Sequence, residues 1–550
     1  MNRRILPLIF FCLISLTSGM SRLSAEGPEF DYLIDNAMIY DGQSNRAMEG
    51  SIAIANDRIV GVGVYEDNQA REIIDAEGLV AAPGFIDAHT HSDFNPIVYP
   101  NLPNKLMQGV TTEIVGNCGM SAAPIAGPHV EHIAGIWARE GVILPEARDW
   151  PEYRDYQHAL ERKGLTTNMA ALVGHGNLRS AVLGFASRAA NADELGRMKE
   201  MLATAMHDGA FGVSFGLVYM PGVFANEEEI TELCKTAAQY DRICAFHMRS
   251  ESSNLVEAVR EVISVAQKTG ARIQISHLKA AGKSNWGKIH EVFELIEGAR
   301  EEGLKIYADV YPYEASFAEL GVQLPDDLYE TEFRVAILRD PSRREALLER
   351  LRAYYKDKDW NAVRIASVEH VDYQGMAGKA LQQAAEEKGK DPVTFLVDLL
   401  ADTAFEVSAF SFSQSTRVVG NVLSKPYVLV GSDSIADDSR FPHPRAYGTF
   451  PVAFAMLTQA SDPREIGDSI ARLTSRPAEH FGLAMRGRIA PGYHADLILF
   501  DPARFRARAS YTEPKVLSQG VAWVFVNGEA VVREGRYDGA KKGHFLSRGA

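Results

Sequence analysis

The chain has 550 residues, of which 46% are apolar and 23% are charged. This composition excludes a disordered or collagen-like chain, and the length exceeds the roughly 100–200 residues of a single domain. The formal net charge of −15 argues against a nucleic-acid-binding surface, because such surfaces carry clustered lysine and arginine.

The first 25 residues have the features of an export signal. Arg3 and Arg4 precede the apolar run 5–16, and small residues follow this run up to Ala25. The run is too short to cross a bilayer comfortably, so no stable membrane span is expected. We therefore expect residues 1–25 to be removed and the mature protein to be exported, periplasmic or secreted. The export route, twin-arginine or general secretory, stays open, and a disordered or interfacial tail is the alternative interpretation.

Three cysteines follow this signal, Cys118, Cys234 and Cys244. An odd and sparse set of cysteines predicts no disulfide framework, even in an exported protein. At least one free thiol therefore needs another explanation.

Both ends of the mature chain consist of short apolar runs separated by tight turns, a pattern typical of β-strands. The N-terminal runs lie within residues 31–82, and the clearest C-terminal runs are 495–500 and 521–527. Neither end is large enough for a core of its own. We therefore expect residues 26–83 and 488–550 to join into one small β-sandwich domain.

Between the two ends, short apolar runs alternate with helical patterns, which favours βα units and a parallel sheet. The clearest helical patterns are 192–207, 226–240 and 255–269. Eight such units predict an α/β fold, a (β/α)8 TIM-like barrel formed by residues 84–315 and 425–487. A doubly wound open sheet is the alternative, but no glycine-rich dinucleotide turn follows the first strand. The strand candidates are 85–89, 112–115, 168–173, 212–215, 243–247, 272–277, 305–310 and 427–431.

The interval between the seventh and eighth predicted strands, from Tyr311 to Tyr427, is far longer than a normal connection. It has elements of its own: a basic helix around 343–355, a strand at 363–368 and a helix at 377–388. We therefore predict that residues 316–424 form an inserted subdomain at the catalytic face, a candidate lid.

Side chains that bind metals stand at or just beyond the ends of five of the eight predicted strands. A barrel places its active site at these C-terminal strand ends. Zinc suits histidine, cysteine and carboxylate ligands, and a catalytic zinc keeps one position open. We therefore predict a zinc site for metal-assisted hydrolysis, with an amide as the favoured substrate and Asp433 as the proton carrier. The residues are His89 and His91 after the first strand, Cys118 after the second, His247 after the fifth, His277 after the sixth and Asp433 after the eighth.

Nine short motifs, spread over nearly all of the mature chain, make the sequence resemble the D-aminoacylase (N-acyl-D-amino-acid deacylase) family of the amidohydrolase superfamily. Together they are much more specific than a single His-x-His pair. The motifs are PGFIDAHTH at 83–91, GVTT at 109–112, GNCG at 116–119, GHG at 174–176, GLVYMPG at 216–222, SHLK at 276–279, YPY at 311–313, GSD at 431–433 and GRIAPGYHAD at 487–496.

The resemblance implies a zinc-dependent hydrolase that splits N-acyl amino acids, expected to be the D-isomers, into a carboxylate and a free amino acid. In the family pattern one zinc is tightly bound and a second site is weaker. Many amidohydrolases bridge two metals with a carboxylated lysine on strand four, but residues 212–217 contain no lysine, and the Cys118 thiolate is the expected substitute. Cys118, His247 and His277 would hold the tight zinc, and His89, His91 and Asp433 would form the weaker site.

The resemblance also implies how the carboxylate of this small-molecule substrate is held. Lys279 would contact it, together with Tyr219, Tyr311 and Ser316. Asp433 would act first as general base and then as general acid. For Lys279 the alternative interpretation is a solvated loop cation.

Three further stretches have weaker assignments. For His175 a structural role is an equally weighted alternative, and Arg249 and Glu251 are expected to steady the loop around His247. Residues 443–450 (HPRAYGTF) match a family stretch near the site. Just after this stretch the family commonly has an arginine, whereas this chain has Val452. We therefore assign no role to an arginine in this region.

Two other functions remain open. One is a cyclic-amide (hydantoinase-like) or dipeptide hydrolase of the same superfamily. The other is an exported zinc-binding protein without catalysis, against which the intact Asp433 argues. The sequence leaves the oligomeric state, the enantiomer, the acyl group and the preferred side chain undetermined.

Overall fold

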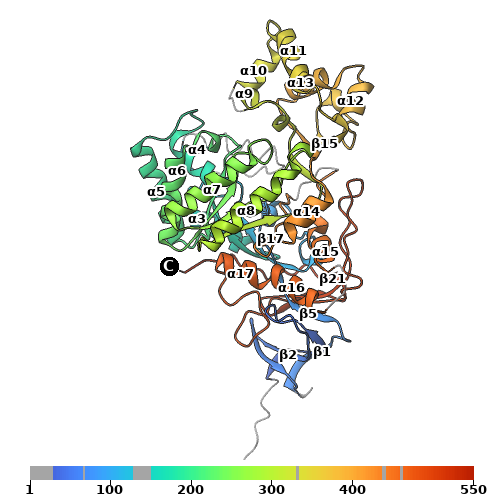
Figure 1. The fold of residues 1–550 in the computed structure, drawn as a ribbon. Helices are drawn as coiled ribbons and strands as arrows, with labels where there is room; N and C mark the ends of the chain where they lie inside the picture. Colours follow the sequence, from blue (N-terminus) through green and yellow to red (C-terminus); the bar gives the residue numbers. More distant parts are fainter. Residues whose placement is uncertain are drawn as a thin grey trace, which may run out of the picture.

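The computed structural model describes residues 29–65, 69–127, 130, 150–329, 333–435, 441–458 and 463–549. The predicted export signal lies outside these residues. Figure 1 shows a β domain at the bottom, a central barrel and an insertion at the top. Among the helices of the described ranges, none has the length and apolar character needed to span a bilayer.

The two chain ends form one nine-stranded sheet, which confirms the prediction that they join. The strand β5 (Val80–Pro83) connects them, because it pairs in parallel with β1 (Phe30–Ile39) and antiparallel with β18 (Leu497–Phe500). Both ends also contribute to one apolar core, for example Ile52 from the first half and Phe525 from the second. The other strands are β2 (Met48–Ala55), β3 (Arg58–Gly63), β4 (Ala70–Asp75), β19 (Val521–Val526), β20 (Glu529–Arg533) and β21 (Arg536–Tyr537).

All eight predicted barrel strands are present, and neighbouring strands pair in parallel. The first and last strands meet where the Ala88 N–H donates to the Val430 carbonyl at 3.1 Å, so the sheet is a barrel rather than an open doubly wound sheet. The strands are β6 (Phe85–Asp87), β7 (Val110–Val115), β8 (Asn168–Ala171) with its continuation β9 (Val173–Gly174), β10 (Gly212–Gly216), β11 (Ile243–His247), β12 (Arg272–Ile275), β13 (Ile306–Val310) and β17 (Val428–Val430).

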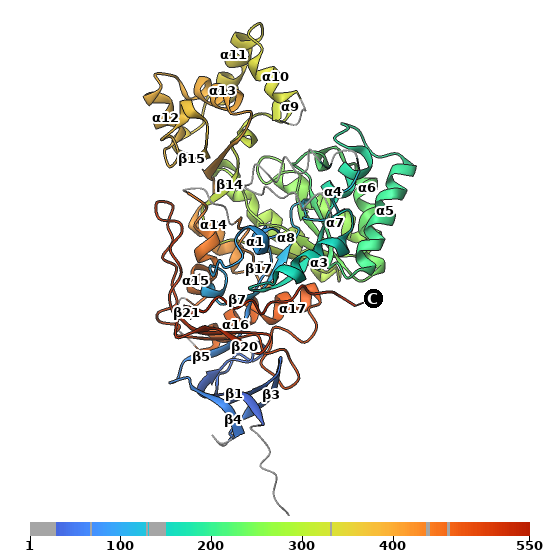
Figure 2. The same cartoon turned by 180° about the vertical axis from the view of Figure 1, so that it is seen from behind.

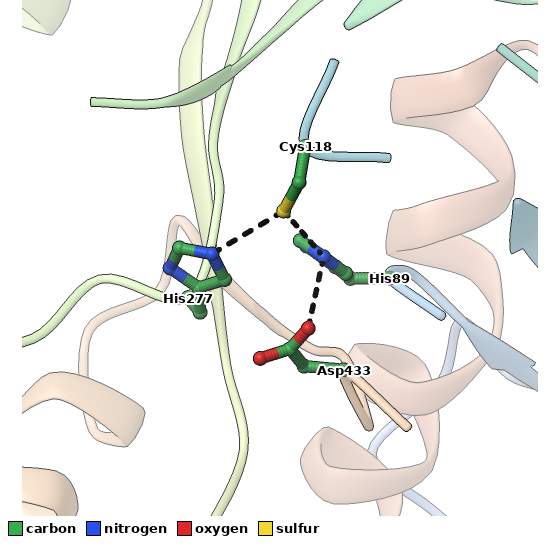
Figure 3. Close-up of side chains that lie close together, drawn as sticks. All are labelled: His89, Cys118, His277 and Asp433. Carbon is green, nitrogen blue, oxygen red and sulfur yellow. Dashed lines mark hydrogen bonds and ion pairs between the residues drawn. The ribbon is translucent and has the colours of Figure 1, made fainter. Parts of the chain in front are cut away.

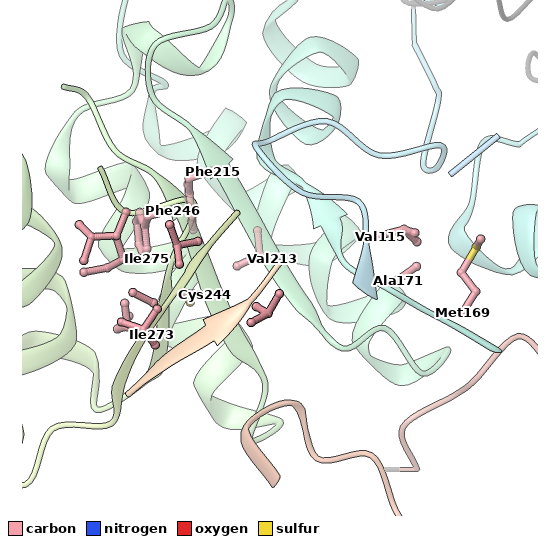
Figure 4. Packing of buried hydrophobic residues seen from close by; sticks show 14 of the residues in the cluster. Val115, Met169, Ala171, Val213, Phe215, Cys244, Phe246, Ile273 and Ile275 are labelled. Atoms are coloured by element: carbon pink, nitrogen blue, oxygen red, sulfur yellow. The ribbon is translucent and has the colours of Figure 1, made fainter. Parts of the chain in front are cut away.

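Alternate residues along the barrel strands enter two separate apolar layers, as the two-residue period of a strand requires. Val213, Phe215 and the thiol of Cys244 belong to the outer cluster (Figure 4). Cys234 of the helix that covers these strands belongs to the same cluster. Residues such as Ile114 belong to a second cluster, in the barrel interior. The helices of the barrel region are α1 (Asn95–Val98), α3 (Tyr153–Lys163), α4 (His175–Leu183), α5 (Ala192–His207), α6 (Glu227–Gln239), α7 (Leu255–Thr269), α8 (Ile289–Glu301), α14 (Thr416–Leu423), α15 (Arg445–Leu457), α16 (Pro463–Leu473) and α17 (Ser475–Phe481).

The inserted segment has a core of its own, which includes Leu351, Leu396 and Leu399. Figures 1 and 2 show its helices projecting beyond the barrel, with strands at the junction. These strands form an antiparallel sheet in the order β14-β16-β15. The elements are β14 (Ala315–Glu319), α9 (Asp326–Tyr329), α10 (Arg334–Arg339), α11 (Arg344–Tyr354), β15 (Val363–Val368), α12 (Leu381–Glu387), α13 (Pro392–Asp402) and β16 (Val407–Phe412).

The insertion is shorter at its C-terminal side than the predicted range 316–424. Helix α14 buries Val418, Val422 and Leu423 in the cluster of the barrel rather than in the core of the insertion. This helix therefore belongs to the barrel unit that precedes β17, because its apolar face is covered by barrel residues.

Four buried polar side chains join the β domain to the barrel. The Asp496 carboxylate accepts hydrogen bonds from Arg486, from the Asn168 side chain at 3.2 Å and from the Asn527 backbone N–H at 2.8 Å. The Asn527 side chain also donates to Asn168 at 2.8 Å. Asp496, the last residue of the GRIAPGYHAD motif, therefore neutralises the charge of Arg486, which is buried at the junction.

We expect Asp496→Asn to reduce the free energy of unfolding by about 3 kcal/mol, because Arg486 would stay buried without a charged partner. Thermal unfolding followed by circular dichroism measures the change. The same substitution at Asp538, which is exposed in the same domain, is the control. Equal midpoints for the two variants would contradict the structural role of Asp496.

Candidate active site

The six predicted metal ligands lie together at the C-terminal ends of the barrel strands. Three of them, Cys118, His277 and Asp433, have positive φ angles of 53°, 35° and 48°. Such a backbone is strained for residues other than glycine and persists only when its surroundings hold it. Here the His277 N–H donates to Asp309 at 2.8 Å, and the Asp433 N–H donates to the His89 carbonyl at 2.7 Å.

The Cys118 sulfur lies between the two parts of the site (Figure 3). It is 3.4 Å from His277 Nε2 and 3.4 Å from His89 Nε2. On one side, His277 Nε2 is 3.0 Å from His247 Nδ1. On the other side, Asp433 Oδ1 is 3.4 Å from His89 Nε2 and 3.2 Å from His91 Nε2. The structure thus brings all six residues together. Two groups have ligand atoms within 4.8 Å of one another, His89, Cys118, His277 and Asp433 in one and His247, Glu251 and His277 in the other, and they share His277.

The donor set and its spacing fit zinc. Bond lengths of about 2.3 Å to sulfur and about 2.1 Å to nitrogen separate the ligand atoms of a tetrahedral zinc by about 3.3–3.6 Å. The Cys118 sulfur is 3.4 Å from His277 Nε2, within this range, and His277 Nε2 is 3.0 Å from His247 Nδ1, slightly closer than this range. One thiolate and two imidazoles leave a fourth position open, as a catalytic zinc requires.

The charges around Cys118 favour its thiolate form. Burial raises the pKa of the thiol, but the neighbouring His89 and His277 rings lower it well below its usual range. The thiolate is the form that binds a metal. Strand β10 contains no lysine, and Cys118 occupies the place between the two sets of ligands, which supports the predicted substitution of a thiolate for a carboxylated lysine.

Two carboxylates contact the Nδ1 atoms of His89 and His277, the ring nitrogens that face away from the thiol of Cys118. His89 Nδ1 lies 3.2 Å from Asp309, and His277 Nδ1 lies 2.6 Å from Glu251. A metal-binding histidine commonly donates its second N–H to such a carboxylate, which fixes the ring orientation.

Asp309 is not among the residues predicted from the sequence to form the site. Asp309 is the one charged residue in the apolar strand β13. Because a buried carboxylate needs hydrogen-bond partners, this position could have predicted that Asp309 contacts polar groups of the site. Glu251 was predicted to steady the loop around His247; it contacts His277, and its carboxylate lies within 4.8 Å of the ring nitrogens of both histidines.

Arg445 is a site residue to which the sequence analysis gave no role. It is buried, and its Nη1 donates to Asp433 Oδ2 at 2.8 Å. Burial raises the pKa of Asp433, but Arg445 and the hydrogen bonds from His89 and His91 hold it well below its usual range. His443 fixes the start of α15, since its Nδ1 accepts the Arg445 N–H at 3.0 Å and its Nε2 donates to the Ala315 carbonyl at 3.0 Å.

Lys279 and Tyr311 lie beside the metal ligands on the side of strands β12, β13 and β17. Lys279 contacts Glu251 and is 2.8 Å from His277 Nδ1. The ammonium of Lys279 lies 5.8 Å from the centre of the Tyr311 ring, and the guanidinium of Arg445 lies 4.6 Å from it. The Tyr311 hydroxyl is buried without a hydrogen-bond partner among the described residues. Lys279 is paired with Glu251 and Arg445 with Asp433, and both cations lie near the ring of Tyr311.

The remaining predicted substrate residues lie elsewhere around the site. Tyr219 packs against His247, with ring centres 4.8 Å apart. Burial raises the pKa of Tyr219, and the charges of Cys118 and of Tyr329 in helix α9 raise it further. Ser316 lies in β14, at the base of the insertion, opposite Ser411.

His175 is part of a buried ion-pair cluster. Its Nε2 is 2.8 Å from Glu229, whose carboxylate also accepts two hydrogen bonds from Arg179 at 2.6–2.7 Å. All three side chains are buried behind the loop of Cys118. This arrangement favours the structural interpretation of His175.

The fold and the site define a class of protein: a barrel hydrolase whose metal ligands come from the strand ends. Residues 72–532 match the model of the amidohydrolase family. The chain belongs to this family and, within it, to the D-aminoacylases, or N-acyl-D-amino-acid deacylases.

Two relatives from Alcaligenes xylosoxydans xylosoxydans illustrate the relationship. A D-aminoacylase is 30% identical over 96% of this chain and 99% of its own length. An N-acyl-D-aspartate deacylase is 31% identical over 96% of this chain and 97% of its own length. The solved structure of an N-acyl-D-glutamate deacylase from Bordetella bronchiseptica, in complex with zinc and a phosphonate inhibitor, is 31% identical with a TM-score of 0.80, covering 94% of this chain and 100% of that one. The protein is therefore a metal-dependent hydrolase.

Proposed function

We propose that the protein is a zinc-dependent deacylase that hydrolyses the amide bond of N-acyl-D-amino acids, releasing a carboxylate and the free amino acid. The observation that carries this proposal is the position of Lys279, Tyr311 and Arg445 beside the metal ligands. A free α-carboxylate needs cationic and hydroxyl partners, and these lie on one side of Cys118 and Asp433.

Asp433 has the position and charge of the proton carrier. Arg445 holds one carboxylate oxygen of Asp433, and the other oxygen, beside His89 and His91, is the one we assign to accept a proton from the attacking water and then donate it to the leaving nitrogen. Zinc, when bound by Cys118, His247 and His277, supplies a Lewis acid that polarises the scissile carbonyl. We assign the weaker metal site to His89, His91 and Asp433.

The cations near Tyr311 are proposed to bind the substrate carboxylate. Lys279 and Arg445 both lie near the Tyr311 ring, and the Tyr311 hydroxyl is available as a donor. Glu251 balances the charge of Lys279, so the lysine can be buried without substrate.

We expect Lys279→Ala to raise KM for carboxylate-bearing substrates at least about tenfold with a smaller change in kcat, because a charge-assisted contact contributes about 1.5–3 kcal/mol. Steady-state kinetics with an N-acyl-D-amino acid measures both constants. Lys283→Ala, which changes an exposed lysine four residues away, should leave KM as in the wild type. An unchanged KM in Lys279→Ala would remove this residue from the site.

We propose that the mature enzyme works outside the cytoplasm, which the pattern of residues 1–25 supports. Fractionation of expressing cells, with N-terminal sequencing of the product, tests this. Activity confined to the cytoplasm with an intact N-terminus would contradict it.

A panel of N-acyl D- and L-amino acids, assayed with metal content measured in parallel, tests the proposed reaction. We expect turnover of the D-isomers and loss of turnover when the metal is removed by a chelator. Hydrolysis of hydantoins or dipeptides with none of N-acyl amino acids would instead favour the cyclic-amide or dipeptide hydrolase. Equal background rates for the wild type and Asp433→Ala would favour a zinc-binding protein without catalysis.

A further inference from the structure

Lys105 is a buried lysine to which the proposed reaction assigns no role. Its side chain is 5% exposed, and lysine is rarely buried to this extent unless it is paired. Its ammonium forms ion pairs with the carboxylates of Asp87 and Glu113, which are buried as well. Burial lowers the pKa of Lys105, but the two carboxylates raise it above its ordinary value, so the lysine stays charged. Breaking such a buried ion pair is costly, so the ammonium holds its neighbours in fixed positions.

The other polar contacts of Lys105 reach residues that flank three of the metal ligands. Its Nζ donates to Thr90 Oγ1 at 3.0 Å, and Thr90 is the middle residue of the His-x-His pair. The same Nζ donates to Ser432 Oγ at 2.9 Å, and Ser432 directly precedes Asp433. One ammonium group therefore joins the loop after the first barrel strand to the loop after the eighth.

Asp87 reinforces the same connection. One of its carboxylate oxygens accepts the Ser432 N–H at 2.8 Å, and the other accepts the Ser432 hydroxyl at 2.6 Å. Asp87 also accepts the His89 N–H at 3.3 Å. Because Asp87 and Ser432 are 345 residues apart in the chain, this contact exists only where the closed barrel brings its first and last strands together.

Backbone hydrogen bonds carry the connection to the ligands. The Asp433 N–H donates to the His89 carbonyl at 2.7 Å, and the His91 N–H donates to the Ser434 carbonyl at 3.0 Å. The Thr90 hydroxyl donates to the same Ser434 carbonyl at 3.1 Å. The positions of the two histidines relative to the aspartate therefore depend on how these two loops meet.

The contacts of Lys105 are selective within the site. Among the described residues, none of its hydrogen bonds or ion pairs reaches the proposed ligands of the tight zinc, Cys118, His247 and His277. These three ligands follow the second, fifth and sixth barrel strands. A loss of the Lys105 ammonium should therefore affect the two metal sites unequally.

We propose that Lys105 is a positioning residue, which holds the two loops of the weaker metal site together and so fixes His89, His91 and Asp433 relative to one another. This rests on the proposed function, which assigns these three residues to the weaker metal site and Asp433 to proton transfer. Lys105 acts through Thr90, Ser432 and Asp87.

The test compares Lys105→Met with the wild type in two zinc titrations. Competition with a chromophoric chelator measures the first zinc ion, and calorimetric titration of the enzyme that holds one zinc ion measures the second. We expect the affinity for the second ion to fall about 10–100-fold, the usual effect of residues that orient a ligand, and the affinity for the first to change by less than about threefold. For an N-acyl-D-amino acid, kcat should fall about 10–100-fold as well, with KM nearly unchanged.

Lys199→Met is the matched control. Lys199 forms an ion pair with Glu232 at 2.7 Å on helix α5, where its side chain is 39% exposed. This variant should keep both zinc affinities and the wild-type kcat.

Two milder variants keep the test decisive if Lys105→Met yields no folded protein, since that variant leaves two buried carboxylates without their cation. Thr90→Val and Ser432→Ala each remove one hydroxyl that Lys105 contacts, without changing a charge. Each should weaken the second zinc at least about threefold and leave the first as in the wild type.

The outcomes separate this inference from the proposed function. Wild-type affinity for the second zinc in folded Lys105→Met, or in both milder variants, would overturn the positioning role. Equal losses at both sites would also overturn it, because they would indicate a general structural role. A wild type that binds a single zinc ion would overturn it too. If the zinc titrations give the expected result but the wild type cleaves no N-acyl amino acid, the deacylase function is rejected and the role of Lys105 at the metal site is supported.

Discussion

Replacing Asp433 with asparagine should lower kcat by about 10³-fold, because a positioned general acid–base contributes roughly 10²–10⁴-fold. The amide has nearly the size of the carboxylate, but it cannot carry the proton from water to the leaving nitrogen. The proposed ligands of the tight zinc, Cys118, His247 and His277, remain, so zinc content should stay near that of the wild type. Kinetics together with metal analysis checks both expectations.

The control for this variant is Asp372→Asn, since Asp372 lies in the insertion with a side chain that is 74% exposed. It should retain wild-type kcat. Arg445 would lose its charged partner in Asp433→Asn, so thermal unfolding must be compared as well. A folded, zinc-loaded Asp433→Asn enzyme with an unreduced kcat would show that this carboxylate is not the proton carrier.

Replacing Cys118 with alanine should remove tight zinc binding and activity together. The sulfur contacts ligands on both sides, at 3.4 Å from His277 Nε2 and 3.4 Å from His89 Nε2, so its loss opens both sets. We expect the zinc affinity to fall by more than about 100-fold, which exceeds the usual 10–100-fold effect of residues that only orient a ligand. Competition with a chromophoric chelator measures the affinity directly, without reference to activity.

Two further variants make the Cys118 result specific. Cys234→Ala removes a buried thiol from helix α6, away from the strand ends, and should keep the zinc. His89→Ala should lower activity with less effect on the tight zinc, because His89 belongs to the weaker set. Tight zinc binding by Cys118→Ala would contradict the proposed ligand set, whatever its activity.

Much of the architecture could be predicted from the sequence because it follows from local patterns. The eight apolar runs became the eight barrel strands, since a strand buried on both faces must be apolar along its length. The candidate metal ligands could be located for a similar reason. His89, Cys118, His247, His277 and Asp433 all follow such runs, and parallel strands bring their C-terminal ends to one face.

Other features depend on contacts between distant segments, which no local pattern contains. Helix α14 was assigned to the insertion by its position in the chain, but the surface that covers Val418 and Val422 belongs to the barrel. Arg445 was given no role because the neighbouring position 452 departs from the family pattern, yet its guanidinium reaches Asp433, twelve residues earlier in the sequence.

By itself, the sequence determined the order of the strands, the side-chain chemistry at their ends and hence the class of site. Only the tertiary structure decided which carboxylates support which ligands, that Tyr219 lies against His247, and that Lys279 and Arg445 share one side of the site. The physical reason is that periodicity and residue type act between near neighbours, whereas the partners of a buried charge come from whichever segments the closed barrel brings together.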